Sequence, residues 1–230
     1  MKLKHLIAIG FLTISSFVQA ALVEGQHYNV LPKPLPALAA NKDKIEVTEF
    51  FSFVCIHCRH LDPIMRHHKK SFASDTAFRA EHVIWDDEML NLAKILVAIE
   101  QTRTQDTLNP LVFNALFDQK IELNKPEIFR EWIMQQKGVD SAKILEVYQS
   151  FFANAEANRM KQLTSDYGIN STPMVIVGGK YQLILTSDFN ASMKVLDELI
   201  AKVRAERGLA APKSKPLPRA KGAGFALGLK

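Results

Sequence analysis

Two cysteines separated by two residues are the groups in this sequence best suited to covalent chemistry. The chain of 230 residues contains only Cys55 and Cys58, in the run Cys55-Ile56-His57-Cys58. A bridge between them would close so short a loop that it would add less than ~2 kcal/mol to stability. Reactivity explains such a pair better than stability does. We therefore expect Cys55 and Cys58 to form a redox-active disulfide.

The flanking residues predict that the pair lies where a strand meets a helix. Residues 45–53 are β-branched and aromatic, which is typical of a buried strand. Residues 57–72 look helical, with a kink expected at Pro63. Cys55 would then lie at a helix N-terminus, where free amides and the helix dipole favour the thiolate. We predict that Cys55 is the exposed nucleophile and that Cys58 attacks mixed disulfides formed on Cys55.

Two further side chains are candidates for catalytic roles. His57 would stabilise the Cys55 thiolate as a cation or a hydrogen-bond donor, and the alternative is an exposed histidine that merely fills the turn. Glu49 shares a strand face with apolar residues, so burial should raise its pKa and let it exchange a proton with Cys58. The alternative is a shifted strand that exposes Glu49. The other histidines of this helix are expected on its solvated face: His60, His67 and His68.

A metal site is the alternative use of these cysteines and histidines. Structural zinc usually has four ligands in a tetrahedron, which two cysteines and two histidines on one short helix do not readily form. We therefore predict no metal and no bound cofactor. Stoichiometric zinc in the purified protein would favour the alternative.

The rest of the chain predicts an α/β protein with an inserted helical domain. Strands are expected near residues 27–31, 78–85, 174–177 and 180–185, with a hairpin turn at Gly178-Gly179. Residues 87–167 have no strand pattern, and their apolar residues recur at helical spacing. A final amphipathic helix is expected to begin at Ser187 or Asp188 and to end at Gly208.

The two ends of the chain differ from its body. Residues 1–20 have a basic start, a short apolar run and Val18-Gln19-Ala20, which predicts a cleaved signal peptide and a periplasmic, soluble protein. The alternative, an uncleaved anchor, would need ~20 apolar residues. Residues 209–230 predict a disordered basic tail, in which a contact with a membrane surface or a partner is one possibility. Without the basic residues of both ends, 22 basic residues face 24 acidic ones, which argues against nucleic-acid binding.

Two segments of the sequence resemble the DsbA branch of the thioredoxin superfamily. The run from Glu49 to Cys58 is similar to that family's active-site strand and turn, with Ile56 where proline is common. The run from Gly168 to Tyr181 is similar to its cis-proline loop and hairpin. Both motifs occur in the family's order, with a helical insertion between them.

This resemblance implies a thioredoxin fold and a protein dithiol oxidase. Residues 21–86 and 168–208 would be the two parts of a thioredoxin-like domain, and residues 87–167 the insertion. Pro173 would be cis, and Thr172 would pair with the backbone of a substrate beside Cys55. The implied partners are reduced, unfolded exported proteins and a DsbB-like membrane quinone reductase that reoxidises the enzyme.

A disulfide isomerase or reductase of the same fold is the second reading. Isomerases of this superfamily commonly have an N-terminal dimerisation domain, and the segment between Ala20 and Ile45 is too short for one. A monomeric oxidase is therefore favoured. The departure at Ile56 bears on the redox potential, because the central dipeptide helps to set it.

Overall fold

The computed structural model describes residues 22–38, 41, 43–210 and 212, so the predicted signal peptide and most of the predicted tail lie outside the described residues. The strands are β1 (Tyr28–Val30), β2 (Ile45–Phe51), β3 (Thr76–His82), β4 (Met174–Val177) and β5 (Tyr181–Leu183). The α-helices are α1 (Ile56–His68), α2 (Leu90–Gln101), α3 (Gln105–Phe117), α4 (Pro126–Met134), α5 (Ser141–Gln149), α6 (Phe151–Asp166) and α7 (Phe189–Glu206). Short 3₁₀ helices occur at η2 (Lys69–Ser71) and η3 (Asp87–Met89).

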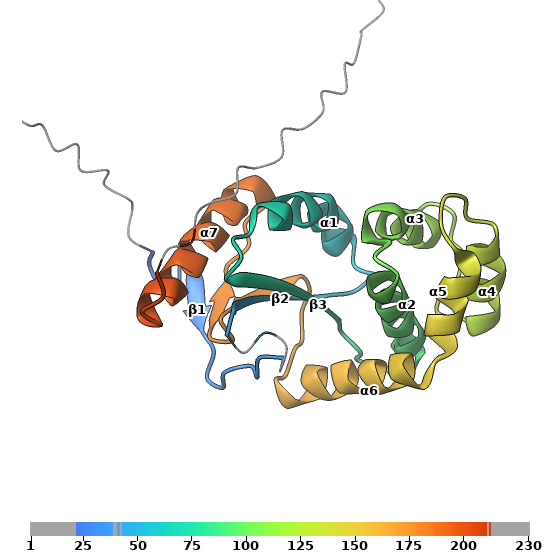
Figure 1. Ribbon diagram of the computed structural model, residues 1–230, viewed down its shortest axis with the longest axis horizontal. Coiled ribbons are helices and arrows are strands. Elements are labelled where there is room, and N and C mark those ends of the chain that lie inside the picture. The colour runs from blue at the N-terminus through green and yellow to red at the C-terminus, as the bar shows by residue number, and fades with distance from the viewer. Residues whose placement is uncertain (1–21, 39–40, 42, 211, 213–230) are drawn as a thin grey trace, which may run out of the picture.

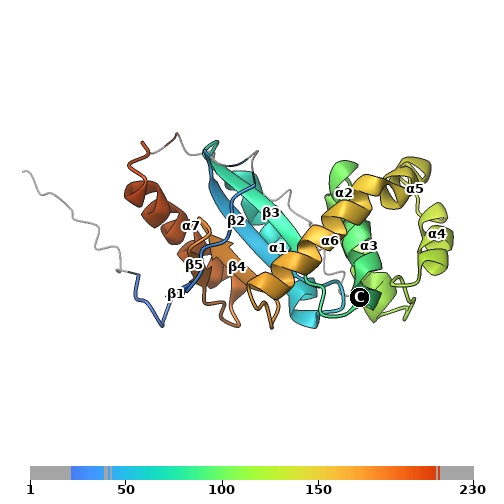
Figure 2. The same ribbon diagram turned by 90° about the horizontal axis from the view of Figure 1, so that it is seen from below.

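The strands form one mixed sheet in the order β1-β5-β4-β2-β3. Strands β2 and β3 are parallel, joined by helix α1, and the other neighbouring strands are antiparallel. Helices α1 and α7 cover one face of the sheet, whereas α6 runs along the opposite face (Figure 1). Helices α2 to α5 extend from the β3 side of the sheet, which gives the molecule an elongated outline (Figure 2).

The central strand β2 is buried along its whole length. Its side chains alternate between the two faces, because successive residues of a strand point in opposite directions. Ile45 and Val47 pack in a core with Leu61 of α1 and Leu199 of α7. Phe50, on the other face, packs with Leu163 of α6. Glu49 has the same parity as Val47 and therefore faces α1.

The β4–β5 hairpin has the predicted glycine turn. Gly178 and Gly179 both have positive φ angles, 62° and 73°, which glycine adopts without steric cost. A side chain at Gly179 would also collide with the carbonyl of Leu35, because its Cβ would lie 2.5 Å from that oxygen. The turn fixes the antiparallel register in which Val177 faces Tyr181.

The predicted helical character of residues 87–167 is confirmed, since five α-helices, α2 to α6, fill this interval. Pro126 begins α4, and Asp140 caps α5 by accepting a hydrogen bond from the amide of Lys143 at 3.0 Å. These helices do not form a hydrophobic core of their own. Phe51 and Phe53, which lead to the cysteines, pack in one cluster with Phe113 of α3.

Several predicted boundaries were wrong. The strand expected at 78–85 spans Thr76–His82. Val83 and Ile84 lie beyond its end and are buried in the core, so their apolar character does not reflect strand structure. The first helix ends at His68 rather than at Phe72, and η2 begins at the next residue, Lys69. The strand expected to reach Phe53 ends at Phe51.

His68 was wrongly placed on the solvated face of its helix. It is 9% exposed, and its Nε2 lies 2.9 Å from Asp197 of α7. His60 and His67 are exposed, as predicted. The error arises because α7 packs on α1, a contact between segments far apart in the sequence.

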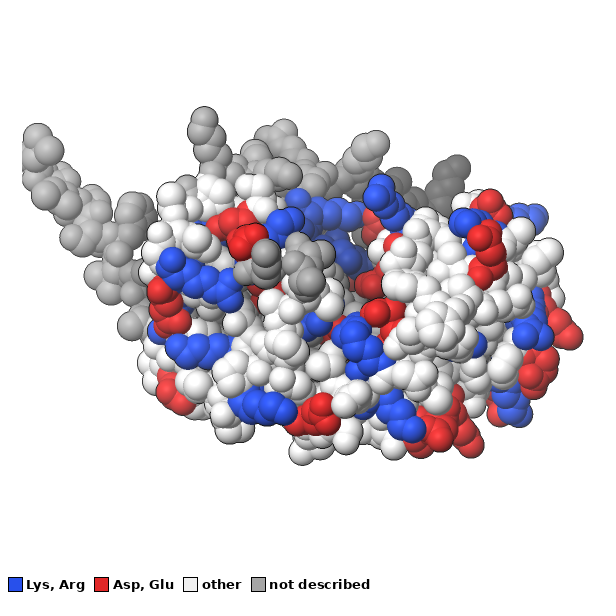
Figure 3. Space-filling view, turned by 60° about the horizontal axis from the view of Figure 1, so that its bottom comes forward, with Lys and Arg blue, Asp and Glu red and all other residues white. Residues whose placement is uncertain are grey.

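Acidic and basic side chains lie interspersed on the face seen in Figure 3, with no stripe of a single sign. Such a mixture gives no continuous positive surface of the kind that binds nucleic-acid backbones. Within the described part of the chain, each helix is too short or too polar to span a bilayer.

Candidate active site

Cys55 occupies the N-cap of α1, directly after the loop that follows β2. Its backbone is extended, with φ −100° and ψ 120°, and its carbonyl accepts the first helical hydrogen bond, from the amide of Arg59 at 3.1 Å. The amide of Cys55 donates to the carbonyl of Ser52, also at 3.1 Å. The predicted position at the helix N-terminus is confirmed, so the unpaired amides of the first turn surround the sulfur.

His82 at the end of β3 holds the loop that leads to Cys55. Its Nε2 accepts a hydrogen bond from the amide of Phe53 at 3.1 Å, and its Nδ1 donates to the carbonyl of Val83 at 2.7 Å. Complete burial lowers the pKa of His82 to about 4, so the ring is neutral at physiological pH. The sequence analysis missed this residue, although a polar side chain at the end of a strand parallel to β2 was a signal for it.

The two sulfurs differ strongly in acidity. Cys55 is partly exposed, whereas Cys58 is 1% exposed, and the two sulfurs are not joined in a disulfide. A hydrogen bond with the Cys58 side chain is the main factor that lowers the pKa of Cys55 to about 5, and partial burial opposes it. Thr172 and the amides of Cys58 and His57 lower it further. Burial raises the pKa of Cys58, so at neutral pH one sulfur is ionised and the other is protonated.

The loop before β4 lies against Cys55. The peptide bond between Thr172 and Pro173 is cis, as the resemblance implied. The Cys55 sulfur lies 3.4 Å from the carbonyl oxygen of Thr172. A residue far away in the sequence thus brings a backbone carbonyl to the reactive sulfur.

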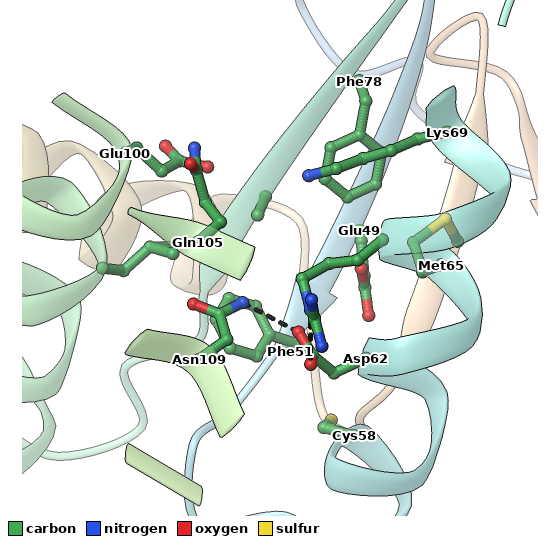
Figure 4. Close-up of a pocket in the computed structure, with 13 residues that line it drawn as sticks. Glu49, Phe51, Cys58, Asp62, Met65, Lys69, Phe78, Glu100, Gln105 and Asn109 are labelled. Atoms are coloured by element: carbon green, nitrogen blue, oxygen red, sulfur yellow. Dashed lines mark hydrogen bonds and ion pairs between the residues drawn. The ribbon is translucent and has the colours of Figure 1, made fainter. Parts of the chain in front are cut away.

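Glu49 is 6% exposed and lines a small cavity with Cys58 and Asp62. Figure 4 shows its carboxylate on the sheet side of the cavity, opposite helix α1. Burial, and secondarily the nearby Asp62, raise the pKa of Glu49 to about 8, while Lys69 opposes the rise. The prediction that Glu49 is buried is confirmed.

Asp62 is held by a residue of the helical segment. The amide Nδ2 of Asn109, in α3, donates to Oδ1 of Asp62 at 2.8 Å. Arg66 donates to its other oxygen at 2.8 Å. Asp62 and Asn109 were not found in the sequence analysis, because nothing in the local pattern shows that α3 packs on α1.

His57 is exposed and lines a surface groove of about 380 Å³. His60 and Pro173 line the same groove. The contribution of His57 to the acidity of Cys55 in this structure comes from its backbone amide. Within the described residues, no cluster of three or more His, Cys, Asp or Glu side chains could hold a metal ion.

The sheet, the helix-capping cysteine and the opposing cis-proline loop define a thiol:disulfide oxidoreductase of the thioredoxin fold. Comparison with known proteins specifies the class further. Residues 73–201 match the model of the DSBA-like thioredoxin domain. The chain is 30% identical over 190 residues to the thiol:disulfide interchange protein DsbA of Burkholderia cepacia, an alignment that covers 82% of this chain and 89% of the relative. The chain belongs to the DsbA family.

Solved structures agree with this assignment. The oxidoreductase NmDsbA1 from N. meningitidis superposes with a TM-score of 0.78 and 41% identity, covering 83% of this chain and 98% of that chain. DsbA of Pseudomonas aeruginosa superposes with a TM-score of 0.72 and 26% identity, covering 80% of this chain and 95% of that chain. The similarity therefore extends over at least 80% of this chain and over nearly the full length of each solved structure.

Proposed function

We propose that the protein is a periplasmic dithiol oxidase that donates the Cys55–Cys58 disulfide to reduced exported proteins. The low pKa of Cys55, about 5, carries this proposal. A thiolate that is stable at neutral pH is a good leaving group, and its stability favours the reduced enzyme. Transfer of the disulfide to a client is therefore thermodynamically favourable.

In the first step a client thiolate attacks the sulfur of Cys55 in the oxidised enzyme. The bond between Cys55 and Cys58 breaks, and Cys58 leaves with the electron pair. Because burial raises the pKa of Cys58, its thiolate takes up a proton. Glu49 lines the same cavity and has a pKa of about 8, so at neutral pH it is mostly protonated and supplies that proton.

In the second step another client thiolate attacks the client sulfur of the mixed disulfide. Cys55 leaves as a thiolate and remains ionised. The client keeps the new disulfide, and the enzyme, which has accepted two electrons, is left with both cysteines reduced. Reoxidation reverses the chemistry at Cys55 and requires an electron acceptor, for which a DsbB-like membrane quinone reductase is the proposed partner.

The groove lined by His57, His60 and Pro173 is the proposed client site. Thr172 would pair with an extended client backbone, and Pro173 would contact the reacting sulfurs. His57 is exposed at the same place, where its ring would stabilise thiolates that form during exchange. A groove of about 380 Å³ has room for a few side chains, which fits broad selectivity.

The proposed organisation follows the sequence prediction. Residues 1–20 would be removed on export, residues 21–86 and 168–208 would form the catalytic domain, and residues 87–167 would be its helical insertion. Residues 209–230 would form a basic tail. The mature protein would act as a monomer in the periplasm.

Substitution of each cysteine tests the assigned roles. We expect Cys55→Ser to abolish disulfide transfer to a reduced, unfolded client, because the variant cannot form the Cys55–Cys58 disulfide that the client attacks. We expect Cys58→Ser, mixed with a client that already carries a disulfide, to accumulate mixed disulfides, because Cys55 attacks the client disulfide and the second enzyme thiol that would release the client is missing. Non-reducing electrophoresis and mass spectrometry measure both. Efficient turnover by either variant would contradict the roles assigned to the sulfurs.

A further inference from the structure

The chain at the end of β3 and directly beyond it is bonded to two parts of the active site. His82 accepts the amide of Phe53 at 3.1 Å and so holds the loop that leads to Cys55. Three residues later, the indole Nε1 of Trp85 donates to the carbonyl of Ile169 at 2.6 Å. Ile169 begins the stretch that leads to β4 and passes the Cys55 sulfur. Four consecutive residues thus bind both segments that meet at this sulfur.

Ile169 is the fixed base of the loop before β4. Its side chain is 4% exposed and packs in one cluster with Phe50 and Ile176. Its amide donates to the carbonyl of Thr164, at the end of α6, at 2.9 Å. The remaining polar group of this residue is its carbonyl, which accepts the bond from Trp85. Trp85 is therefore the side chain that fixes the direction of the peptide leaving Ile169.

The loop between this base and the active site is short. Two exposed residues, Asn170 and Ser171, separate Ile169 from Thr172. Three residues of extended chain span at most about 10 Å, so a displacement at Ile169 reaches Thr172 with little loss. The carbonyl oxygen of Thr172 lies 3.4 Å from the Cys55 sulfur. A hydrogen bond from the Thr172 side chain also lowers the pKa of Cys55.

The backbone that carries Trp85 is itself held in place. The amide of Val83 donates to the carbonyl of Phe51, in β2, at 2.8 Å. The amide of Ile84 donates to Oγ1 of Thr164, in α6, at 3.2 Å. The two residues before Trp85 are thus bonded to the sheet and to α6. Trp85 has a rigid support from which its indole can hold the loop.

The surroundings of the Trp85 ring indicate that it serves as a hydrogen-bond donor more than as a core residue. The ring is 47% exposed and lines a surface groove of about 550 Å³. The other tryptophan of the chain, Trp132, is 6% exposed and packs against Phe129 in the helical segment. A half-exposed indole gains less from apolar burial than Trp132 does, whereas its N–H makes a short bond to a partly buried carbonyl.

We propose that Trp85 is a positioning residue for disulfide exchange, whose indole N–H holds the loop before β4 so that Thr172 stays in contact with Cys55. Trp85 acts through Ile169 and takes no part in bond making or breaking. The inference deepens the proposed function, because it rests on Thr172 as the residue that pairs with the client backbone. A loop held in the bound geometry binds an extended client more tightly, since less ordering is needed when the client arrives.

Replacement of each tryptophan by phenylalanine tests the proposal. Trp85→Phe keeps an aromatic ring and removes the N–H, and Trp132→Phe makes the same chemical change far from the loop. In single-turnover oxidation of a reduced, unfolded client protein, we expect Trp85→Phe to raise the half-saturating client concentration roughly fivefold, the effect of one ordinary hydrogen bond. The maximal rate should change little, because the reacting sulfurs are unaltered. Trp132→Phe should leave both quantities at their wild-type values.

A second measurement reports on the loop without any client. Ultraviolet thiolate absorbance of the reduced protein gives the pKa of Cys55, to which the hydrogen bond from Thr172 contributes. We expect Trp85→Phe to shift the midpoint upward from the wild-type value, because a displaced loop weakens this bond. Trp132→Phe should titrate as the wild type does. A loss of global stability alone would leave the midpoint of the folded protein unchanged.

The outcomes separate the role of Trp85 from the function on which it rests. A Trp85→Phe protein with the wild-type half-saturating concentration and the wild-type midpoint overturns the proposal. A raised half-saturating concentration with an unchanged midpoint also overturns it, since Trp85 would then contact the client directly. Equal changes in Trp132→Phe overturn it as well. A shifted midpoint with unchanged client binding contradicts the pairing of Thr172 with the client and leaves the contact between Trp85 and the loop standing.

Discussion

The chemistry depends on the unequal surroundings of two identical side chains. Cys55 receives hydrogen bonds at a partly exposed helix end, whereas Cys58 is buried one turn further along. The same covalent group is therefore an acid with a pKa of about 5 at one position and a much weaker acid at the other. Burial and hydrogen bonding, rather than a nearby cation, produce most of this difference.

The Cys55 thiolate should be visible in a titration. We expect the ultraviolet thiolate absorbance of the reduced protein to rise with a midpoint near pH 5, well below the ordinary pKa of 9.0. Cys55→Ser should remove this transition, and Cys58→Ala should shift it upward because the hydrogen bond from the Cys58 thiol is lost. A midpoint above pH 8 in the reduced wild type would contradict the dithiol oxidase.

The same pKa predicts a pH-dependent stability of the reduced protein. A group with a lowered folded pKa stabilises the fold fully above its unfolded pKa, near 9, and loses this contribution as the pH falls through about 5. We therefore expect the free energy of unfolding of the reduced wild type, relative to Cys55→Ser, to increase from pH 5 to pH 9. Urea unfolding at several pH values measures it. A constant difference across this range would show that Cys55 is not acidic.

His82 should make the active-site loop sensitive to acid. As a base whose folded pKa is lowered to about 4, it stabilises the fold above its ordinary value of 6.5 and loses this contribution as the pH falls toward 4. His82→Leu leaves the buried amide of Phe53 without an acceptor, so we expect a loss of about 1–3 kcal/mol at pH 7. This loss should shrink at pH 4.5. Equal losses at both values would contradict a neutral, hydrogen-bonded His82.

Polar side chains on one face of helix α1 contact the helical segment, while the opposite face of α1 packs on the sheet. Arg59 pairs with Asp118, Asp62 with Asn109, and Arg66 with Asp106. These residues recur at helical spacing along α1, so a single side of the helix faces α3. The helix that carries both cysteines is thus positioned by the insertion as well as by the sheet.

The contact between Asp62 and Asn109 is the most buried of these pairs. Asn109→Ala removes a hydrogen-bond donor from a buried carboxylate, and we expect it to destabilise the protein by about 1–3 kcal/mol. Urea unfolding measures the loss. Asn114→Ala, which removes a bond to Asp118 at an exposed site of the same helix, is the matched control and should cost much less. Equal losses would show that burial does not strengthen the Asp62 contact.

Local pattern predicted the strands, the helical segment and the cysteine pair. Alternation along β2 was enough to place Glu49 on the buried face, and the two glycines were enough to predict the β4–β5 turn. Lys69, Glu100 and Asn109 were not predicted, because their convergence near Cys58 depends on how α2 and α3 pack against α1. The order of the strands was likewise not predicted, since pairing between distant segments leaves no local signal.

The position of Cys58 beneath Cys55 also bears on oxidative damage. An accessible thiolate is the form of cysteine that peroxides convert to a sulfenic acid, and further oxidation of that acid is irreversible. The Cys58 sulfur lies within hydrogen-bond reach and condenses with a sulfenic acid at Cys55, expelling water and leaving a disulfide. Oxidation of Cys55 by peroxide thus leads to the Cys55–Cys58 disulfide, the active oxidised form, instead of irreversible inactivation.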